Sequence, residues 1–285
     1  MTYLITGVTG QLGSAILEKV SETVAKEDIA VLVRSQEKGQ AFAQAGYEVR
    51  VGDFSDQAKL VENFKGIDRL MFVSSAPGQE VTREQQHRNV LAAAKEAGVS
   101  ALVYTSISNG DKSSAILAPD HIVTEALIKA SGISYKILRN DWYIENEADI
   151  IASAQKDGFF YHAGGSGKVG WALRREYGYA AANALTGDFD SNAVYELAGD
   201  LHTYADLAKA LSTILGKEVE ARGISSQEYR QSLAQAGLPE PVQAIVAGIQ
   251  DDIANHQLEV SHSDFEALLG HAPLDLVESL KEIIG

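Results

Sequence analysis

The 285-residue sequence contains no cysteine. This absence excludes disulfide bonds, a thiolate nucleophile and any zinc site built on cysteine. The seven histidines are scattered and none forms an H-E-x-x-H pattern, so we expect no metal centre. A G-x-S-x-G motif is also missing, which disfavours a serine hydrolase with an α/β fold.

Basic residues and long apolar runs are also scarce. The chain has 24 Lys and Arg against 39 Asp and Glu, which gives a formal net charge of −15 without any block of like charges. Nucleic acid is therefore not expected as a partner, because binding to phosphates favours a basic surface. No apolar run is long enough to cross a bilayer, and no basic leader precedes the first apolar segment. We expect a cytoplasmic protein without a membrane partner.

Short apolar runs alternate with helical patterns over the first half of the chain. We expect strands at residues 3–6, 30–33, 47–51, 69–73, 101–105 and 133–138, with helices between them. This alternation predicts a doubly wound parallel α/β sheet of the Rossmann type. The remainder is less regular, so we predict a dinucleotide-binding domain at 1–158 and a smaller C-terminal α/β lobe on the substrate side at 159–285. The chain could cross between the two.

Three glycines, Gly7, Gly10 and Gly13, follow the first expected strand and open the first expected helix. Gly7 permits a sharp turn, Gly10 lets a pyrophosphate approach the main chain, and Gly13 lets the helix pack close to the strand. The free N–H groups at the start of the helix would then face the phosphates. The pattern predicts a dinucleotide site, although a glycine pattern alone also fits a tight turn.

The second expected strand ends at Arg34, and Lys38 lies one helical turn beyond it. In a dinucleotide-binding fold this strand end meets the adenine ribose, where an acid suits a 2′-hydroxyl and an arginine suits a 2′-phosphate. The sequence therefore predicts NADP(H) as the cofactor. The alternative is a solvated surface charge.

Polar residues also follow the third and fourth expected strands. In doubly wound sheets, ligands lie beyond the carboxyl ends of the strands. We therefore expect Asp53 and Phe54 near the adenine, and Ser74 and Ser75 beside the nicotinamide half of the cofactor. Serine and aspartate at such positions are also common helix caps, so each assignment has a structural alternative.

Two segments near the expected site contain unusual residues. The polar segment from Asn109 to Pro119 is predicted to be a loop and could form a lid. The aromatic pair Trp142 and Tyr143 lies just beyond the sixth expected strand, between two asparagines. It suits a planar ligand, and it suits a corner of the hydrophobic core almost as well.

The Y-x-x-x-K pair with which many reductases protonate a carbonyl is absent from the corresponding helix, which reads from His121 to Glu125. This disfavours a ketone reductase or a sugar-nucleotide epimerase. An acceptor that takes hydride from a well-placed nicotinamide can instead take its proton from water. Asn146 or Tyr143 could orient the acceptor oxygen. His121 could donate a proton, but we favour a role in bracing its helix.

The sequence resembles the NmrA-like family of atypical short-chain dehydrogenases/reductases. Within this family, it looks like the bacterial NAD(P)H:quinone oxidoreductases of type 2. The matching stretches span nearly the whole chain and include Leu138-Arg139-Asn140, Trp142-Tyr143, Glu145-Asn146 and residues 195–200, Tyr-Glu-Leu-Ala-Gly-Asp.

The resemblance implies hydride transfer from NADPH to a quinone-like substrate. It implies that Arg34 holds the 2′-phosphate. It also implies that the pyrophosphate is held within the stretch from Thr6 to Leu12, by Thr6, Gly7, Thr9, Gly10, Gln11 and Leu12. It places Asn140, Trp142 and Tyr143 around the nicotinamide, Asn146 on the substrate side and Lys168 at the mouth of the cleft. Trp171 and Gly110-Asp111 depart from the family pattern, and they bear on the choice of acceptor.

Two other functions stay open at this point. Some NmrA-like proteins sense the redox state of a bound dinucleotide without turnover, and the missing Tyr-Lys pair fits that role as well. A non-enzymatic NADP-binding remnant is the third alternative. The apolar helix that includes residues 91–97 and the C-terminal helices could pack against a second copy, so a homodimer is possible.

Overall fold

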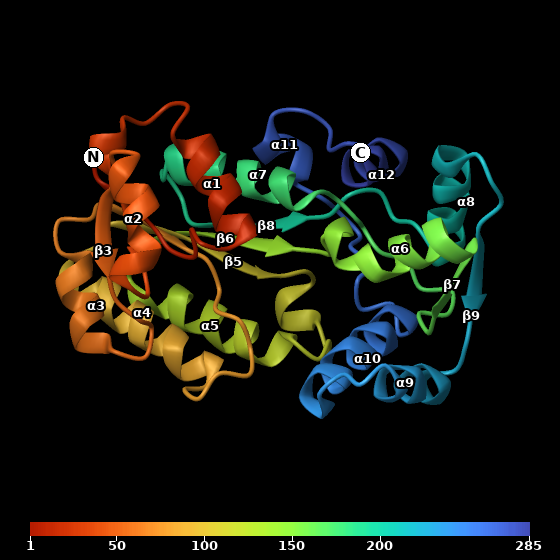
Figure 1. Ribbon diagram of the computed structural model, residues 1–285. Helices are drawn as coiled ribbons and strands as arrows, with labels where there is room; N and C mark the ends of the chain where they lie inside the picture. Colours follow the sequence, from red (N-terminus) through yellow and green to blue (C-terminus); the bar gives the residue numbers. More distant parts are fainter.

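The computed structural model describes all 285 residues and is built around one seven-stranded parallel sheet (Figure 1). The strand order is β3–β2–β1–β4–β5–β6–β8. The strands are β1 Tyr3–Ile5, β2 Ile29–Val33, β3 Glu48–Val51, β4 Arg69–Phe72, β5 Ala101–Ile107, β6 Ser134–Asn140 and β8 Ala193–Leu197. The predicted doubly wound Rossmann sheet is confirmed.

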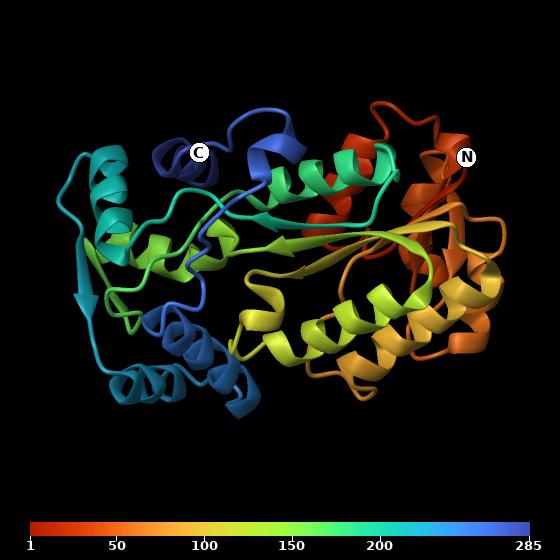
Figure 2. The same ribbon diagram turned by 180° about the vertical axis from the view of Figure 1, so that it is seen from behind.

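Helices cover both faces of this sheet (Figures 1 and 2). One layer consists of α1 Gln11–Val20, α2 Gln36–Gln44, α7 Arg174–Thr186 and α11 Phe265–Leu269, and the other of α3 Gln57–Phe64, α4 Arg83–Ala97 and α5 Ala118–Ser131. Successive residues of a strand point to opposite faces, so Leu4 and Ile5 belong to different hydrophobic cores. Both faces of the sheet are thereby buried, as a parallel sheet requires.

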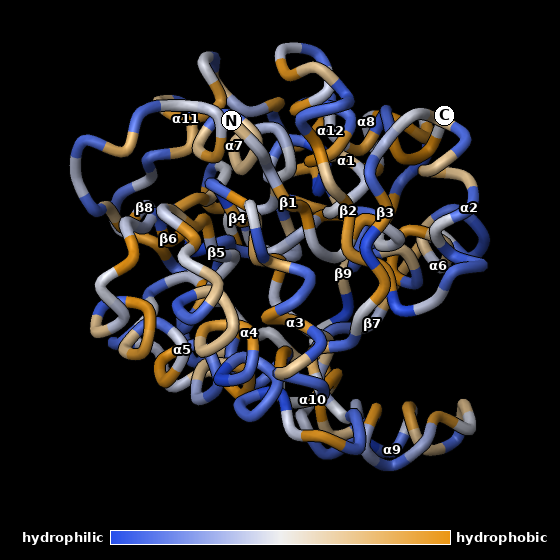
Figure 3. The backbone as a smooth tube through the Cα atoms, turned by 90° about the vertical axis from the view of Figure 1, so that its left-hand side faces the viewer, coloured by the Kyte–Doolittle hydropathy of each residue, from blue (hydrophilic) through white to orange (hydrophobic).

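A third hydrophobic core lies in the C-terminal part of the chain. It is enclosed by α6 Ala148–Asp157, β7 Phe159–His162, α8 Tyr204–Leu215, α10 Glu240–Ala254 and α12 Leu276–Ile284. β7 pairs in parallel with β9 Glu220–Gly223. The remaining helix, α9 Ser226–Gln235, buries none of its residues and lies at the periphery of the molecule (Figure 3). No helix has both the length and the apolar character needed to cross a membrane.

The chain returns from the C-terminal part to the central sheet. α7 packs against α1, and β8 pairs with β6 at the edge of the sheet. The boundary predicted at residue 158 therefore does not separate the sheet from the lobe, because residues 174–197 belong to the layers of the sheet. The chain thus runs from the sheet into the C-terminal part and back to the sheet.

Three helical segments differ from the expectation. α6 and α11 were not predicted, and α7 begins at Arg174, whereas the sequence pattern predicts this helix only from Tyr177 to Leu185. α11 has only five residues, too few to show a helical period. The early start of α7 has a consequence for the site, because it places Arg174 in the first turn.

Candidate active site

A cleft of about 580 Å³ opens at the carboxyl ends of β1, β2 and β4. This is the edge at which a doubly wound sheet binds its ligands. Most of the predicted cofactor-binding residues line the cleft, together with one predicted catalytic residue: Thr6, Gly7, Thr9, Gly10, Gln11, Leu12, Gly13, Arg34, Asp53, Phe54, Ser74, Ser75 and Tyr143.

The glycine turn has the geometry of a phosphate cradle. Gly7 has φ of 71°, and the amide of Gly10 donates to the carbonyl oxygen of Gly7 at 2.9 Å. A Cβ on Gly13 would overlap that same carbonyl group, so only glycine permits this approach of helix and turn. Gly10 caps α1 without any side-chain hydrogen bond, which leaves the first N–H groups of the helix free for an anion. These residues fit a pyrophosphate.

Two arginines face this end of the cleft. Arg34 is exposed, lines the cleft and forms no ion pair. Arg174 also lines the cleft, and its guanidinium donates to the side chain of Gln11 and to Asn146 Oδ1, the latter at 2.8 Å. Glu145 accepts from the backbone amide of Arg174 at 2.9 Å and fixes the start of α7. Sequence reasoning missed Arg174 because it is far from the glycine motif in the chain.

Three predicted site residues lie outside this cleft and also outside the second, smaller cavity that adjoins it. Lys38 is exposed on α2, and Lys168 is exposed in the glycine loop that follows β7. Asn146 is also exposed, and its amide oxygen is already occupied by Arg174. The predicted contact of Asn146 with the acceptor does not fit this placement, and neither lysine reaches a cavity wall.

A second cavity, of about 180 Å³, adjoins the cleft beyond the ends of β5 and β6. Ser74, Arg83, Leu117 and Tyr143 line both spaces, so the two meet at these side chains. Further lining residues come from the C-terminal part, among them Ile249 and Leu258 from α10 and the segment that follows it. The predicted site residues Asn140, Trp142 and His121 line this second cavity and not the main cleft.

Asn140 and Tyr143 form a polar pair on the wall of the second cavity. The Asn140 amide donates to the Tyr143 hydroxyl at 3.1 Å, whereas Asn140 Oδ1 is buried without a hydrogen-bond partner. An unpaired buried oxygen of this kind fits a donor group on a ligand. Burial raises the pKa of Tyr143, so its hydroxyl stays neutral at physiological pH.

His121 belongs to a buried chain of polar rings. Its Nδ1 lies 2.8 Å from the hydroxyl of Tyr104, which is also near His87. Burial and the neighbouring Arg83 lower the pKa of His87 to about 3, and burial lowers that of His121 well below its usual value. Both rings are therefore neutral at physiological pH, which favours the bracing role of His121. No hydrogen bond joins His121 to Glu125, although the two residues lie one helical turn apart.

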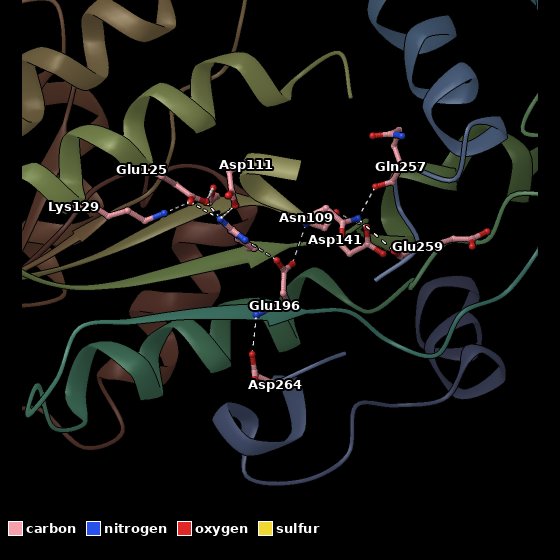
Figure 4. Close-up of polar contacts among 12 residues, drawn as sticks. Asn109, Asp111, Glu125, Lys129, Asp141, Glu196, Gln257, Glu259 and Asp264 are labelled. Atoms are coloured by element: carbon pink, nitrogen blue, oxygen red, sulfur yellow. Dashed lines mark hydrogen bonds and ion pairs between the residues drawn. The ribbon is translucent and has the colours of Figure 1, made fainter. Parts of the chain in front are cut away.

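Glu125 is bound instead to Arg139, which fixes one wall of the second cavity. The Arg139 guanidinium donates to Glu125 at 2.7 and 2.9 Å, to Glu196 at 3.0 Å and to Asp111 at 2.8 Å. Figure 4 shows these three carboxylates converging at the strand ends. The unusual Asp111 thus ties the segment after β5 to the sheet.

The segment from Asn109 to Pro119, which could form a lid, is anchored at several points. It contains a short 3₁₀ helix, Gly110–Lys112. The Asn109 side chain donates to the backbone oxygen of Gln257 at 2.9 Å, and the amide of Ile116 donates to Asp252 at 2.9 Å (Figure 4 shows the contact of Asn109). The segment therefore forms a fixed wall between the sheet and α10 in this structure.

Trp171 fills the core of the lobe and does not narrow either cavity. It is 3% exposed, and its indole N–H donates to Glu147 Oε1 at 3.2 Å. Trp142 donates to the same oxygen at 3.0 Å. The departure of Trp171 from the family pattern therefore does not change the size of either cavity, because its ring packs against Tyr204 in the lobe.

Arg83 is a further residue that sequence reasoning missed. It is the first residue of α4 and is 9% exposed. Its Nε and Nη1 atoms are buried without any hydrogen-bond partner. In the sequence it stands nine residues after Ser74, too far from the end of β4 to be predicted as a site residue. Only the fold brings it to the cavities.

The fold and the site define a dinucleotide-binding protein of the Rossmann type with an adjoining second cavity. The model of the NmrA-like family matches residues 1–271, and the chain belongs to this family. Quinone oxidoreductase 2 of Escherichia coli is 37% identical over 283 residues, which cover 99% of this chain and 98% of that protein.

Solved structures give the same relationship. An Escherichia coli NADPH-dependent quinone oxidoreductase complexed with NADPH has a TM-score of 0.94 at 36% identity and covers 100% of both chains. The triphenylmethane reductase of Citrobacter sp. complexed with NADP(H) has a TM-score of 0.93 at 32% identity and covers 99% of both chains.

Proposed function

We propose that this protein is an NADPH-dependent oxidoreductase that transfers hydride to a quinone or a similar planar carbonyl acceptor. The observation that carries the proposal is the junction of two spaces, a cofactor cleft with Arg34 at its ribose end and a second cavity at the other end. The relatives described as an NADPH-dependent quinone oxidoreductase and a triphenylmethane reductase support it.

The cleft suggests how the cofactor lies. Its pyrophosphate would meet the glycine turn and Arg174, and its 2′-phosphate would meet Arg34. The nicotinamide would then reach Ser74 and Tyr143, where the second cavity begins. An acceptor in the second cavity would therefore lie next to the reactive ring.

The chemistry at this junction needs no protein acid. The bound cofactor supplies the hydride. No lysine lines either cavity, and burial raises the pKa values of Tyr104 and Tyr143, so a tyrosine–lysine proton donor is absent. A reduced quinone can take its proton from water, and the residues of the chain position the reactants and exclude solvent.

The test is the oxidation of NADPH with a benzoquinone and a naphthoquinone as acceptors, repeated with NADH and with Arg34→Ala. We expect quinone-dependent turnover by the wild-type protein. Arg34→Ala should raise the KM for NADPH by about tenfold or more, because it removes a charge-assisted contact with the 2′-phosphate. The KM for NADH should change little.

The control is Lys38→Ala, which removes an exposed cation one helical turn from Arg34 that lines neither cavity. It should leave both KM values nearly unchanged. If the wild-type protein binds NADP(H) but oxidises no NADPH with any of the quinones, the proposed activity is refuted. That result would favour the alternative function, a regulatory NADP(H) sensor without turnover.

We also propose that the protein is a cytoplasmic homodimer. A homodimer would use the apolar surfaces of the C-terminal helices, and light scattering would measure it. A cytoplasmic location would give the protein access to NADPH, and cell fractionation would test it.

A further inference from the structure

Arg83 is a buried cation on which the nearby carboxylate of Asp120 acts only from a distance, without an ion pair. Its guanidinium forms no ion pair. Only 9% of the residue is exposed, and its Nε and Nη1 atoms are buried without a hydrogen-bond partner. Burial lowers the pKa of Arg83, yet a guanidinium stays charged in proteins. A buried charge without a partner is costly, so this position fits a ligand that supplies negative charge or an acceptor oxygen.

The location of Arg83 indicates which ligand this is. The phosphate end of the cleft already has Arg34 and Arg174, and both line only the main cleft. Arg83 lies at the junction with the second cavity, beside Ser74 and Tyr143. Its place is therefore the acceptor end of the site.

The other ionisable groups on the second cavity do not compensate Arg83. Asp141 is held by the Ser108 hydroxyl at 2.9 Å and the Gly170 amide at 2.8 Å, and Asp252 accepts from the amide of Ile116. Neither carboxylate forms an ion pair. His121 is neutral, so Arg83 is the one cation that faces this cavity.

We propose that Arg83 binds the carbonyl oxygen of the acceptor and stabilises the oxyanion that forms on that oxygen during hydride transfer. This inference rests on the proposed quinone reductase function. A C–H bond of the reduced nicotinamide breaks, and its hydrogen leaves with both electrons and forms an O–H bond with the carbonyl oxygen of the quinone that does not face Arg83. The quinone becomes a hydroquinone monoanion while NADPH is oxidised to NADP⁺. The negative oxygen stays paired with Arg83 until water donates a proton to it.

The first experiment measures binding without turnover. The probe is 4-nitrophenol, whose phenolate resembles the hydroquinone monoanion and absorbs at longer wavelength than the neutral phenol. It is titrated against wild-type, Arg83→Met and Arg83→Lys protein in saturating NADP⁺. The wild-type protein should bind the phenolate and shift its titration to lower pH. Arg83→Met should lose this shift and about tenfold or more in affinity, whereas Arg83→Lys should keep most of both.

The second experiment measures kinetics with a series of quinones. In Arg83→Met, kcat should fall by about tenfold to a hundredfold, and most for the quinones whose hydroquinone anions are most basic. The Kd for NADPH, measured by fluorescence, should stay within about twofold of the wild-type value. The control is Arg88→Met, an exposed arginine on the same helix that pairs with Glu84 and lines neither cavity. It should leave all these quantities nearly unchanged.

Three results would overturn parts of this picture in different ways. Unchanged phenolate binding and kcat in Arg83→Met would refute the role of Arg83 while the proposed function stands. A variant that loses NADPH affinity but keeps kcat at saturating NADPH would also refute it, because Arg83 would then hold the cofactor. Wild-type protein without quinone turnover would refute the proposed function itself.

Discussion

Glu147 shows how strongly its surroundings determine the behaviour of one residue. Its carboxylate accepts hydrogen bonds from Trp142 at 3.0 Å and Trp171 at 3.2 Å, with the Tyr204 hydroxyl at 3.5 Å. No cation is paired with it. Burial therefore raises the pKa of Glu147 from its usual 4.5 to about 7. The folded protein favours the neutral acid over a pH range in which the unfolded chain carries the anion.

This shift predicts a pH-dependent stability. Between pH 4.5 and about 7 the folded state binds more protons at Glu147 than the unfolded state, so the free energy of unfolding should fall as the pH rises through this window. Glu147→Gln should remove this contribution, at most about 3 kcal/mol. Urea unfolding at pH 5 and pH 8 would measure the difference.

Glu266→Gln is the matched control, because Glu266 is exposed and its side chain forms no hydrogen bond. It should keep the wild-type slope. Asp141, whose pKa burial also raises to about 7, contributes a slope of the same sign that remains in Glu147→Gln. A Glu147→Gln variant with the full wild-type slope would show that Glu147 is ionised in the folded protein.

At the scale of the elements, the packing of α7 on α1 sets the position of Arg174 beside the first turn of α1. A Cβ on Gly178 would lie 2.7 Å from Ala15 Cβ and 3.3 Å from the backbone of α1. The two helices can approach this closely only because both contact residues are small. Arg174 lies one helical turn before Gly178, and its guanidinium reaches Gln11 in the first turn of α1.

Gly178→Ala tests this packing. In an exposed helix the change would stabilise the protein by about 1 kcal/mol, because alanine has the higher helix propensity. Here we expect a loss of about 1–3 kcal/mol instead, because overpacking forces the helices apart. The Kd for NADPH should rise as Arg174 moves from the cleft. Thermal unfolding and fluorescence titration would measure the two effects.

Arg175→Ala serves as the control for this prediction. Arg175 is exposed on the same helix and pairs with Glu282 at 2.9 Å, and an exposed pair of this kind contributes about 1 kcal/mol at most. Its NADPH affinity should equal that of the wild type. A stabilised Gly178→Ala protein would mean that the α1–α7 contact is looser than the structure shows.

At the scale of the whole molecule, the two cavities join the sheet and the lobe. The main cleft is built almost entirely by the first 90 residues, with Arg174 contributed by α7. The second cavity combines the ends of β5 and β6 with Ile249 and Leu258. A cofactor bound across the strand ends therefore contacts elements that lie far apart in the chain, and it should stabilise the folded state as a unit.

This stabilisation should depend on the 2′-phosphate. NADPH at a hundredfold excess over its Kd should add about 2.7 kcal/mol to the free energy of unfolding, by mass action. The Tm should then rise by roughly 4–5 °C for a chain of this size. Arg34→Ala should need a higher NADPH concentration for the same shift, whereas its response to NADH should match that of the wild type. Equal NADPH responses in the two proteins would refute the assignment of Arg34.

The sequence by itself determined the sheet, the glycine turn and the cation at the end of β2. These features are local, because a strand, a tight turn and the start of a helix each depend on residues within a few positions of one another. Gly7, Gly13 and Arg34 could therefore be placed at one edge of the sheet from the order of the elements alone. The resemblance to the NmrA-like family extended the same argument to Asn140 and Tyr143.

Only the tertiary structure decided which other residues reach the site. Arg83 and Arg174 lie at the starts of two helices that carry no local motif, and helix packing brings them to the cleft. Conversely, Asn146 and Lys168 stand in stretches that match the family, yet they lie outside both cavities. The separation of the second cavity from the first depends on contacts such as Asn109 with Gln257, across 148 residues of chain. Such contacts follow from packing, which no local pattern encodes.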